Sequence, residues 1–237
     1  MLRPRGLLFD YGGTLVDEVE FNARAGVELL LARAEYRPAR ATLEAVMERA
    51  DRVSREVAAR RNTFQIETPW PSLTRLIHDF FGTRFAEPWS ALELAFWDAS
   101  VKTRPMPGVY AALAEFHHCG VPMGVVSNSS FAQHVIRHEL AKHELADHLA
   151  IVIVSAEYAV RKPNPLLFET AMAMLGVRPE DAWFVGDSFD ADIVGAKAAG
   201  MTALWYAPSP AEQPEGADLV VRTWDEVVTA FRQARGE

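Results

Sequence analysis

The chain has 237 residues, 49% hydrophobic and 24% charged, and a formal net charge of −8. Its apolar fraction is ample for a buried core and excludes a disordered chain. No apolar run approaches the roughly 18 residues of a membrane span, and the N-terminal apolar stretch is too short for a signal peptide. The acidic balance argues against nucleic acid and membranes as partners. A single cysteine, Cys119, fits a reducing cytoplasm.

Short apolar runs that stop at polar residues alternate with helical patterns along most of the chain. These runs predict strands at 6–10, 121–126, 151–154 and 182–185, with weaker candidates at 202–206 and 218–221. Helical patterns at 109–118, 131–140, 165–175 and 193–199 separate them. Strands that alternate with helices predict an α/β fold with a doubly wound parallel sheet.

Residues 17–99 lack this alternation and are interpreted as helices only. The predicted helices are 21–33, 42–61, 72–81 and 89–101, separated by breaks that contain proline. Because this block follows the first strand and precedes the rest of the sheet, we expect an insertion. The predicted domains are a core of 1–16 with 100–237 and an all-helical domain of 17–99. Without the insertion about 154 residues remain, close to one ordinary domain of roughly 150.

Polar side chains collect where the predicted strands end, the edge at which open α/β sheets bind ligands. They are Asp10, Ser127, Asn128, Asp187 and, slightly later, Asp192, with Lys162 at a loop-to-helix junction. Three carboxylates repel one another without a cation, and hard oxygen ligands of this kind suit Mg²⁺. Mg²⁺ and Lys162 together would balance the three acids. A phosphate dianion would then be attracted to the site, with Asp10 placed to attack phosphorus.

Four segments, in order, resemble the motifs of the haloacid dehalogenase (HAD) superfamily. They are FDYGGTL at 9–15, VSNS at 126–129, KPNP at 162–165 and GDSFDAD at 186–192. The resemblance spans nearly the whole chain and implies a hydrolase of subfamily I with a Rossmann-like core. It further implies that the helical insertion is a C1-type cap, which closes over a small phosphorylated metabolite, and that an aspartyl-phosphate forms. The oligomeric state stays open.

The same resemblance assigns the metal ligands. Asp10 is the nucleophile and a Mg²⁺ ligand, together with Asp187, Asp192 and the backbone carbonyl of Gly12. Asp190 is a secondary candidate for metal contact. Asp192 has an alternative role as the cap of the helix that begins at 193.

The remaining site residues are assigned to the phosphoryl group. Ser127 would hydrogen-bond a phosphoryl oxygen, with Asn128 beside it. Lys162 would neutralise charge on the nucleophile and on the phosphoryl group. Thr14 would orient the first loop.

Gly12 departs from the family pattern. Phosphatases of the family usually carry a second Asp there, which protonates the leaving group and then activates water. The loss of a general acid/base typically costs about 10²–10⁴ in rate, so slow hydrolysis or a long-lived phosphoenzyme is expected unless a neighbour substitutes. The candidate neighbours are Tyr11, Asp17, Glu18, Glu20 and His78.

Two other functions stay open beside the phosphatase. The dehalogenase branch of the family also lacks the second Asp, acts on carbon and needs no metal. Its fourth motif typically lacks the Gly-Asp that this chain retains at 186–187, and the retained acid favours phosphoryl chemistry. The other alternative is a non-catalytic protein whose pocket binds phosphate or a partner.

Overall fold

The computed structural model describes residues 2–207 and 216–236. Within them, six parallel strands form the central sheet, in the order β5-β4-β1-β6-β7-β8. The strands are β1 (Gly6–Phe9), β4 (Met123–Ser127), β5 (Ile151–Val154), β6 (Ala182–Gly186), β7 (Thr202–Tyr206) and β8 (Leu219–Val221). The predicted α/β fold with a doubly wound parallel sheet is confirmed.

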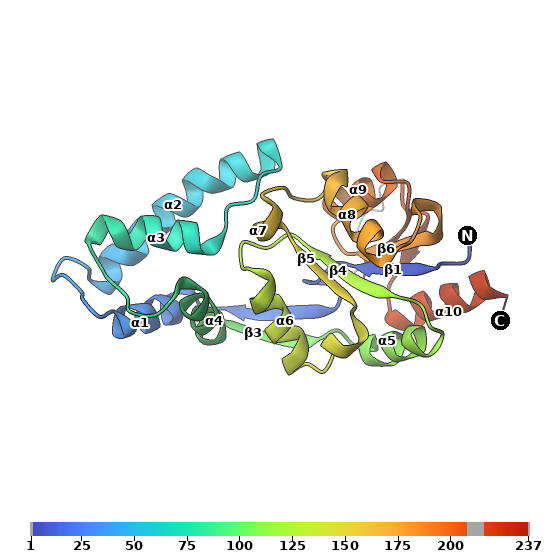
Figure 1. The fold of residues 1–237 in the computed structure, drawn as a ribbon, viewed down its shortest axis with the longest axis horizontal. Coiled ribbons are helices and arrows are strands. Elements are labelled where there is room, and N and C mark those ends of the chain that lie inside the picture. The colour runs from blue at the N-terminus through green and yellow to red at the C-terminus, as the bar shows by residue number, and fades with distance from the viewer. Residues whose placement is uncertain (1, 208–215, 237) are drawn as a thin grey trace.

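Helices cover both faces of this sheet (Figure 1). One face is covered by α5 (Val109–His118), α6 (Gln133–Lys142) and α10 (Trp224–Arg235), and the other by α8 (Pro165–Leu175) and α9 (Val194–Ala198). Successive residues of a strand point to opposite faces. Leu7 and Phe9 therefore join one hydrophobic core and Leu8 the other, which explains why β1 is a continuous apolar run.

Four helices form the part of the molecule that extends to the left of the core in Figure 1. They are α1 (Ala23–Arg33), α2 (Leu43–Phe64), α3 (Trp70–Phe81) and α4 (Trp89–Ser100). Thr42 caps α2 by accepting a hydrogen bond from the Ala45 N–H. Proline at the second position of α3 lacks the N–H that a first turn leaves unpaired. All four predicted helices are present, with ends within three residues of those expected.

The expectation of helices only over 17–99 was wrong at its N-terminal end. Residues Val16–Phe21 form β2, which pairs antiparallel with β3 (Val101–Pro105) in a separate two-stranded ribbon. Ion pairs cross the ribbon from Asp17 to Arg104 and from Glu20 to Lys102. Most side chains of β2 stay exposed, so its sequence lacks the buried apolar run that reveals the core strands. This ribbon connects the four helices to the sheet.

A second connection joins the helical part to the core. The segment after α2 pairs with the segment after the short helix α7 (Ser155–Tyr158). The N–H of Glu67 donates to the Ala159 carbonyl at 3.2 Å, and the N–H of Arg161 donates to the Gln65 carbonyl at 2.9 Å. The helical part is thus joined to the core at two places, by the β2–β3 ribbon and by this backbone pairing. Among the described residues, no helix combines the length and apolar content needed to cross a bilayer.

Candidate active site

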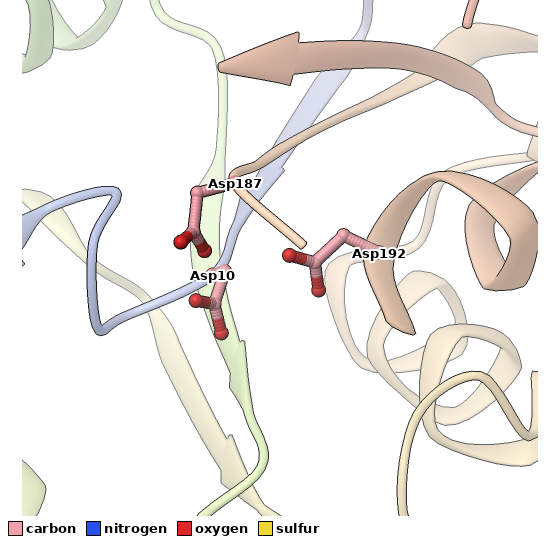
Figure 2. Close-up of side chains that lie close together, drawn as sticks. All are labelled: Asp10, Asp187 and Asp192. Atoms are coloured by element: carbon pink, nitrogen blue, oxygen red, sulfur yellow. The ribbon is translucent and has the colours of Figure 1, made fainter. Parts of the chain in front are cut away.

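Three carboxylates lie together at the carboxyl ends of β1 and β6 (Figure 2). Asp10 follows β1, Asp187 follows β6, and Asp192 lies in the π-helical turn Phe189–Ile193. One oxygen from each lies within 4.8 Å of the others. Asp10 and Asp192 are buried, whereas Asp187 is exposed. The predicted acid cluster therefore forms from segments that are far apart in the sequence.

Two glycines permit this close approach of the acids. Gly13 has φ +72°, and a Cβ there would lie 2.5 Å from Asp187 Oδ2. A Cβ at Gly186 would lie 2.4 Å from Asp192 Oδ2. Real Cβ atoms do not come so close, and residues other than glycine rarely adopt such a φ. The glycines of the first and last motifs are therefore required by the packing of the two carboxylates.

Lys162 is the cation of the cluster. Its Nζ lies 2.6 Å from Asp10 Oδ1 and 2.6 Å from Asp192 Oδ1, with a side chain that is 1% exposed. Burial disfavours the charged amine, but the two carboxylates outweigh it and raise the pKa of Lys162. Partial desolvation of the Asp187 carboxylate, followed by the charge of Asp10, raises the pKa of Asp187, so Lys162 alone does not neutralise the charge of this cluster.

Asp192 does not cap a helix. Helix α9 begins at Val194 and its N-cap residue is Ile193. The Asp192 carboxylate instead points to Lys162 and accepts a hydrogen bond from the Ser188 N–H at 3.0 Å. Asp190 is exposed and lies outside the cluster of three acids.

The residues predicted to bind phosphate occupy different positions. Ser127 is buried at the end of β4 and lines the cleft beside Asp10. Asn128 also lines the cleft, but its amide oxygen accepts from the Lys162 N–H at 2.8 Å and its amide nitrogen donates to the Lys162 carbonyl at 3.0 Å. Asn128 therefore positions the lysine. Thr14 is fully buried behind the loop, and its carbonyl accepts from Trp224 Nε1 at 3.1 Å.

Gly12 leaves room in the cleft, a hollow of about 280 Å³. A Cβ built there would have one neighbouring atom within 4 Å, Glu18 Oε1 at 3.8 Å. Both residues line the cleft with Asp10. Partial desolvation of the Glu18 carboxyl in the cleft, then the charges of Asp10 and Glu139, raise the pKa of Glu18. The carboxylate of Glu18 thus lies beside the position at which the family pattern has its second Asp.

The other four candidates for the missing acid/base are less suited to the role than Glu18. Asp17 and Glu20 form ion pairs across the ribbon. His78 lies on α3, away from the cleft, and lines a separate hollow among the helices. Tyr11 lines the cleft but is 2% exposed, and burial, followed by nearby carboxylates, strongly raises its pKa. Tyr11 therefore holds its proton too firmly to act as a base.

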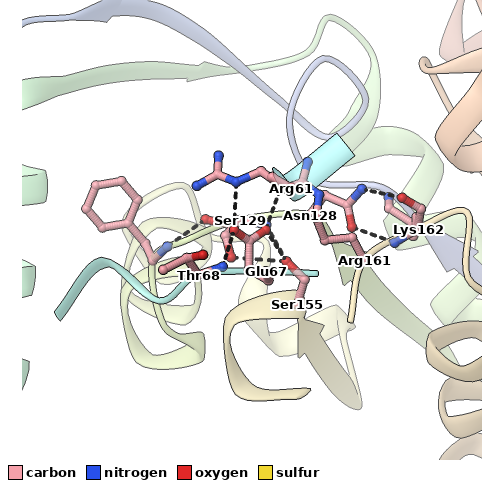
Figure 3. Close-up of polar contacts among 9 residues, drawn as sticks. Arg61, Glu67, Thr68, Asn128, Ser129, Ser155, Arg161 and Lys162 are labelled. Carbon is pink, nitrogen blue, oxygen red and sulfur yellow. Dashed lines mark hydrogen bonds and ion pairs between the residues drawn. The ribbon is translucent and has the colours of Figure 1, made fainter. Parts of the chain in front are cut away.

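Two charged residues near the cleft were missed by the sequence analysis. Arg161 lines the cleft, and its guanidinium forms an ion pair with Glu67, which is 3% exposed. The Glu67 carboxylate also accepts from Ser155 Oγ at 2.9 Å and pairs with Arg61 Nε at 3.2 Å (Figure 3). Arg161 directly precedes Lys162, and this position in the sequence could have indicated that it lies near the site. Glu67 had no such signal, because it lies between two helices of the insertion and its partners are distant in the sequence.

A family model described as haloacid dehalogenase-like hydrolase matches residues 4–200. The chain belongs to this family. Phosphoglycolate phosphatase 1 of Pseudomonas aeruginosa is 32% identical over 206 residues, covering 86% of this chain and 70% of the relative. The phosphoserine phosphatase of Thermus thermophilus is 36% identical over 126 residues, 52% of this chain and 50% of the relative. The alignment thus spans about half the length of the latter relative.

Solved structures of the family share the fold of this HAD-like hydrolase. A 2-haloacid dehalogenase from Pseudomonas syringae pv. Tomato has a TM-score of 0.68 at 22% identity, covering 98% of this chain and 99% of that chain. A HAD phosphatase from Thermococcus onnurineus has a TM-score of 0.61 at 22% identity, covering 96% and 97%. Both phosphatases and dehalogenases therefore have this architecture, and the fold alone does not separate the two reactions.

Proposed function

We propose that this HAD-like hydrolase is a Mg²⁺-dependent phosphatase that acts on a small phosphorylated metabolite in the cytoplasm through an aspartyl-phosphate at Asp10. The observation that carries the proposal is the buried Asp10–Lys162–Asp192 arrangement with Asp187 beside it. Phosphatases among the sequence relatives support the reaction class. The single cysteine, Cys119, supports the location.

The acid cluster fits a divalent cation. It offers hard oxygen ligands from Asp10, Asp187 and Asp192, and the raised pKa of Asp187 indicates that a further positive charge would be stabilising there. The backbone carbonyl of Gly12 is proposed as the fourth protein ligand. When bound, Mg²⁺ would polarise the phosphoryl oxygens and neutralise charge that develops on them.

The protein residues then divide the remaining work. Asp10 attacks phosphorus as the phosphorus–oxygen bond to the leaving group breaks. Lys162 stabilises negative charge on the phosphoryl group and orients Asp10, and Asn128 holds the backbone of Lys162. Ser127 donates a hydrogen bond to a phosphoryl oxygen. Hydrolysis of the aspartyl-phosphate regenerates Asp10.

We propose Glu18 as the group that replaces the missing acid/base. Its carboxylic acid would protonate the leaving oxygen, and its carboxylate would then accept a proton from the water that attacks the aspartyl-phosphate. The position of Glu18 Oε1 beside Gly12 supports this role. Strand β2, which carries Glu18, leads into the proposed cap, residues 17–99, and its partner β3 follows the cap. Movement of the cap would therefore move the acid.

Asp10→Asn tests the reaction. We expect p-nitrophenyl phosphate turnover that requires Mg²⁺ and falls at least about 10³-fold in Asp10→Asn. The matched control is Asp190→Asn, an exposed acid outside the cluster, which should keep wild-type turnover. Metal-independent halide release from a 2-haloacid would instead establish the dehalogenase alternative. The absence of turnover with any phosphate ester would favour the non-catalytic alternative.

A second pair of variants tests Glu18. Glu18→Gln should lower turnover about 10²–10⁴-fold, whereas Glu20→Gln on the same strand should leave it unchanged. Gly12→Asp should raise the turnover of the wild type and rescue Glu18→Gln, because the space beside Gly12 accepts a side chain. Wild-type turnover in Glu18→Gln would contradict the assignment without affecting the role of Asp10.

A further inference from the structure

A large apolar hollow lies inside the helical part of the molecule, separate from the catalytic cleft. It has a volume of about 400 Å³, within the range of roughly 300–1,000 Å³ found for small-molecule sites. Side chains from all four helices line it, and most are apolar. They include Val27, Leu30, Val57, Trp70, Ile77 and Phe96. Some lining residues, such as Ala58, are exposed, so the hollow opens to solvent, and its size and apolar character fit a small-molecule site.

Aromatic rings form one wall of the hollow. Trp70 lies 5.0 Å from Phe96 and 5.9 Å from Phe131, measured between ring centroids. Phe131 does not belong to the helical part: it lies in the core, between β4 and α6. The wall therefore joins cap and core, and a ligand against it contacts both.

The hollow also contains a buried polar group without a partner. His78 is 1% exposed, and its Nδ1 has no hydrogen-bond partner among the described residues. Burial lowers the pKa of His78 to about 4, so the imidazole is neutral at pH 7. A neutral imidazole offers one donor and one acceptor. The hollow thus combines mostly apolar walls with a few polar side chains, His78 among them, the usual composition of a ligand site.

The hollow and the catalytic cleft share a boundary. Ser127, Asn128 and Ser129 line the cleft, and the next two residues of the same loop, Ser130 and Phe131, line the hollow. A second link crosses the same boundary. Arg61 lines the hollow and Arg161 lines the cleft, and Glu67 binds both (Figure 3). The cleft and the hollow are therefore neighbours, separated by this loop and by the ion pairs of Glu67.

We propose that the hollow binds the organic part of the substrate, an apolar alkyl or aryl group esterified to the phosphate that occupies the cleft. This proposal rests on the phosphatase function and narrows its substrate to phosphate monoesters with an apolar tail. A small polar metabolite would leave the hollow unfilled and would gain nothing from its walls.

A series of n-alkyl phosphates from ethyl to octyl tests the proposal. Each methylene that enters an apolar site should raise kcat/KM about fourfold until the hollow is filled. A value of kcat/KM that is flat or falls with chain length would overturn the proposal while leaving the phosphatase function intact.

Two matched variants on α2 test whether the hollow causes the dependence of kcat/KM on chain length. Ala50 lines the hollow and is half-buried, whereas Ala59 is exposed and lies outside it. Ala50→Phe should lower the ratio of kcat/KM for octyl over ethyl phosphate at least tenfold, and Ala59→Phe should leave the ratio unchanged. An equal ratio in both variants would place the chain-length effect elsewhere and contradict the assignment.

A binding measurement separates the two proposals. Titration of the wild-type protein with octan-1-ol, which has the tail and lacks the phosphate, should quench or shift the fluorescence of the tryptophans with saturation. Octanol binding without turnover of any phosphate ester would refute the phosphatase and uphold an apolar ligand site. Turnover of phosphate esters with no saturable octanol binding would refute the hollow as a tail site.

Discussion

The catalytic cleft and the apolar hollow are built in opposite ways. In the cleft, a few charges determine the properties: Lys162 lies 2.6 Å from each of two carboxylates at the ends of parallel strands. In the hollow, many apolar side chains from four helices contribute small contacts, and the neutral imidazole of His78 is buried among them. The comparison predicts a division of labour, in which the core determines the reaction and the cap determines the substrate.

The two regions should also respond differently to substitution. A buried charge that loses its partner is strongly destabilising, so a single change in the cleft has a large effect. An apolar wall loses contacts one at a time. Glu67 lies between the two regions and belongs energetically with the cleft, since its carboxylate is buried and binds Arg161, Arg61 and Ser155.

The largest effect is expected for Lys162→Met. Removal of the cation leaves Asp10 and Asp192 buried without a counter-charge, which should cost about 3–5 kcal/mol of unfolding free energy without metal. Turnover should fall at least about 10²-fold. Urea unfolding in EDTA and turnover in Mg²⁺ measure the two effects. The control is Lys102→Met, whose 75% exposed side chain pairs with Glu20 and should contribute less than about 0.5 kcal/mol. Similar costs for both variants would contradict the comparison.

A smaller effect is expected for Glu67→Leu, at the boundary of the two regions. The change leaves Arg161 and Ser155 without their buried acceptor and should lower the unfolding free energy by about 2–4 kcal/mol. Limited proteolysis should cleave the segment between α2 and α3 faster. Glu56→Leu is the control, because that carboxylate is 71% exposed in a surface pair with Arg60. If Glu67→Leu matched the control in both measurements, Glu67 would not be a structural link between cap and core.

The smallest effect is expected in the hollow, from the titration of His78. Its folded pKa of about 4 lies below the ordinary value of 6.5, so protonation favours the unfolded chain. The contribution to stability is present above pH 6.5 and is lost as the pH falls towards 4. Between pH 7 and pH 5 the wild type should lose about 2 kcal/mol more than His78→Phe.

Urea unfolding at the two pH values measures the effect of His78. His118→Phe changes an exposed imidazole on α5 and should keep the wild-type pH dependence. An equal loss of unfolding free energy in the wild type and in His78→Phe would show that the imidazole is hydrated. The hollow would then contain water despite its apolar walls.

The core strands and the acid cluster were predictable because their signal is local. A run such as Gly6–Phe9 must be apolar on both faces, and the polar residue that follows it marks the strand end. Parallel strands bring such ends to one edge, which places Asp10 near Asp187 without knowledge of the packing. The ribbon strand Val16–Phe21 was missed because its side chains remain exposed, so burial imposes no pattern on it.

Side-chain direction was not predictable in the same way. Asp17, Glu18 and Glu20 are equivalent candidates in the sequence, and pairing with β3 engages the first and the last in ion pairs. Only Glu18 is left facing the gap beside Gly12. Glu67 and Arg161 meet across 94 positions, a contact that no local pattern encodes.

The sequence by itself determined the family, the parallel sheet, the four helices of the insertion and the set of acids at the strand ends. Periodic burial and the chemistry of the motifs depend on residues that are close in the sequence, so local sequence patterns are enough to predict these features. Tertiary structure decided that Asn128 holds Lys162, that Glu18 lies beside Gly12, and that the helices enclose an apolar hollow next to the cleft. These features depend on how distant elements pack, because packing selects which side chains of each helix and strand face one another.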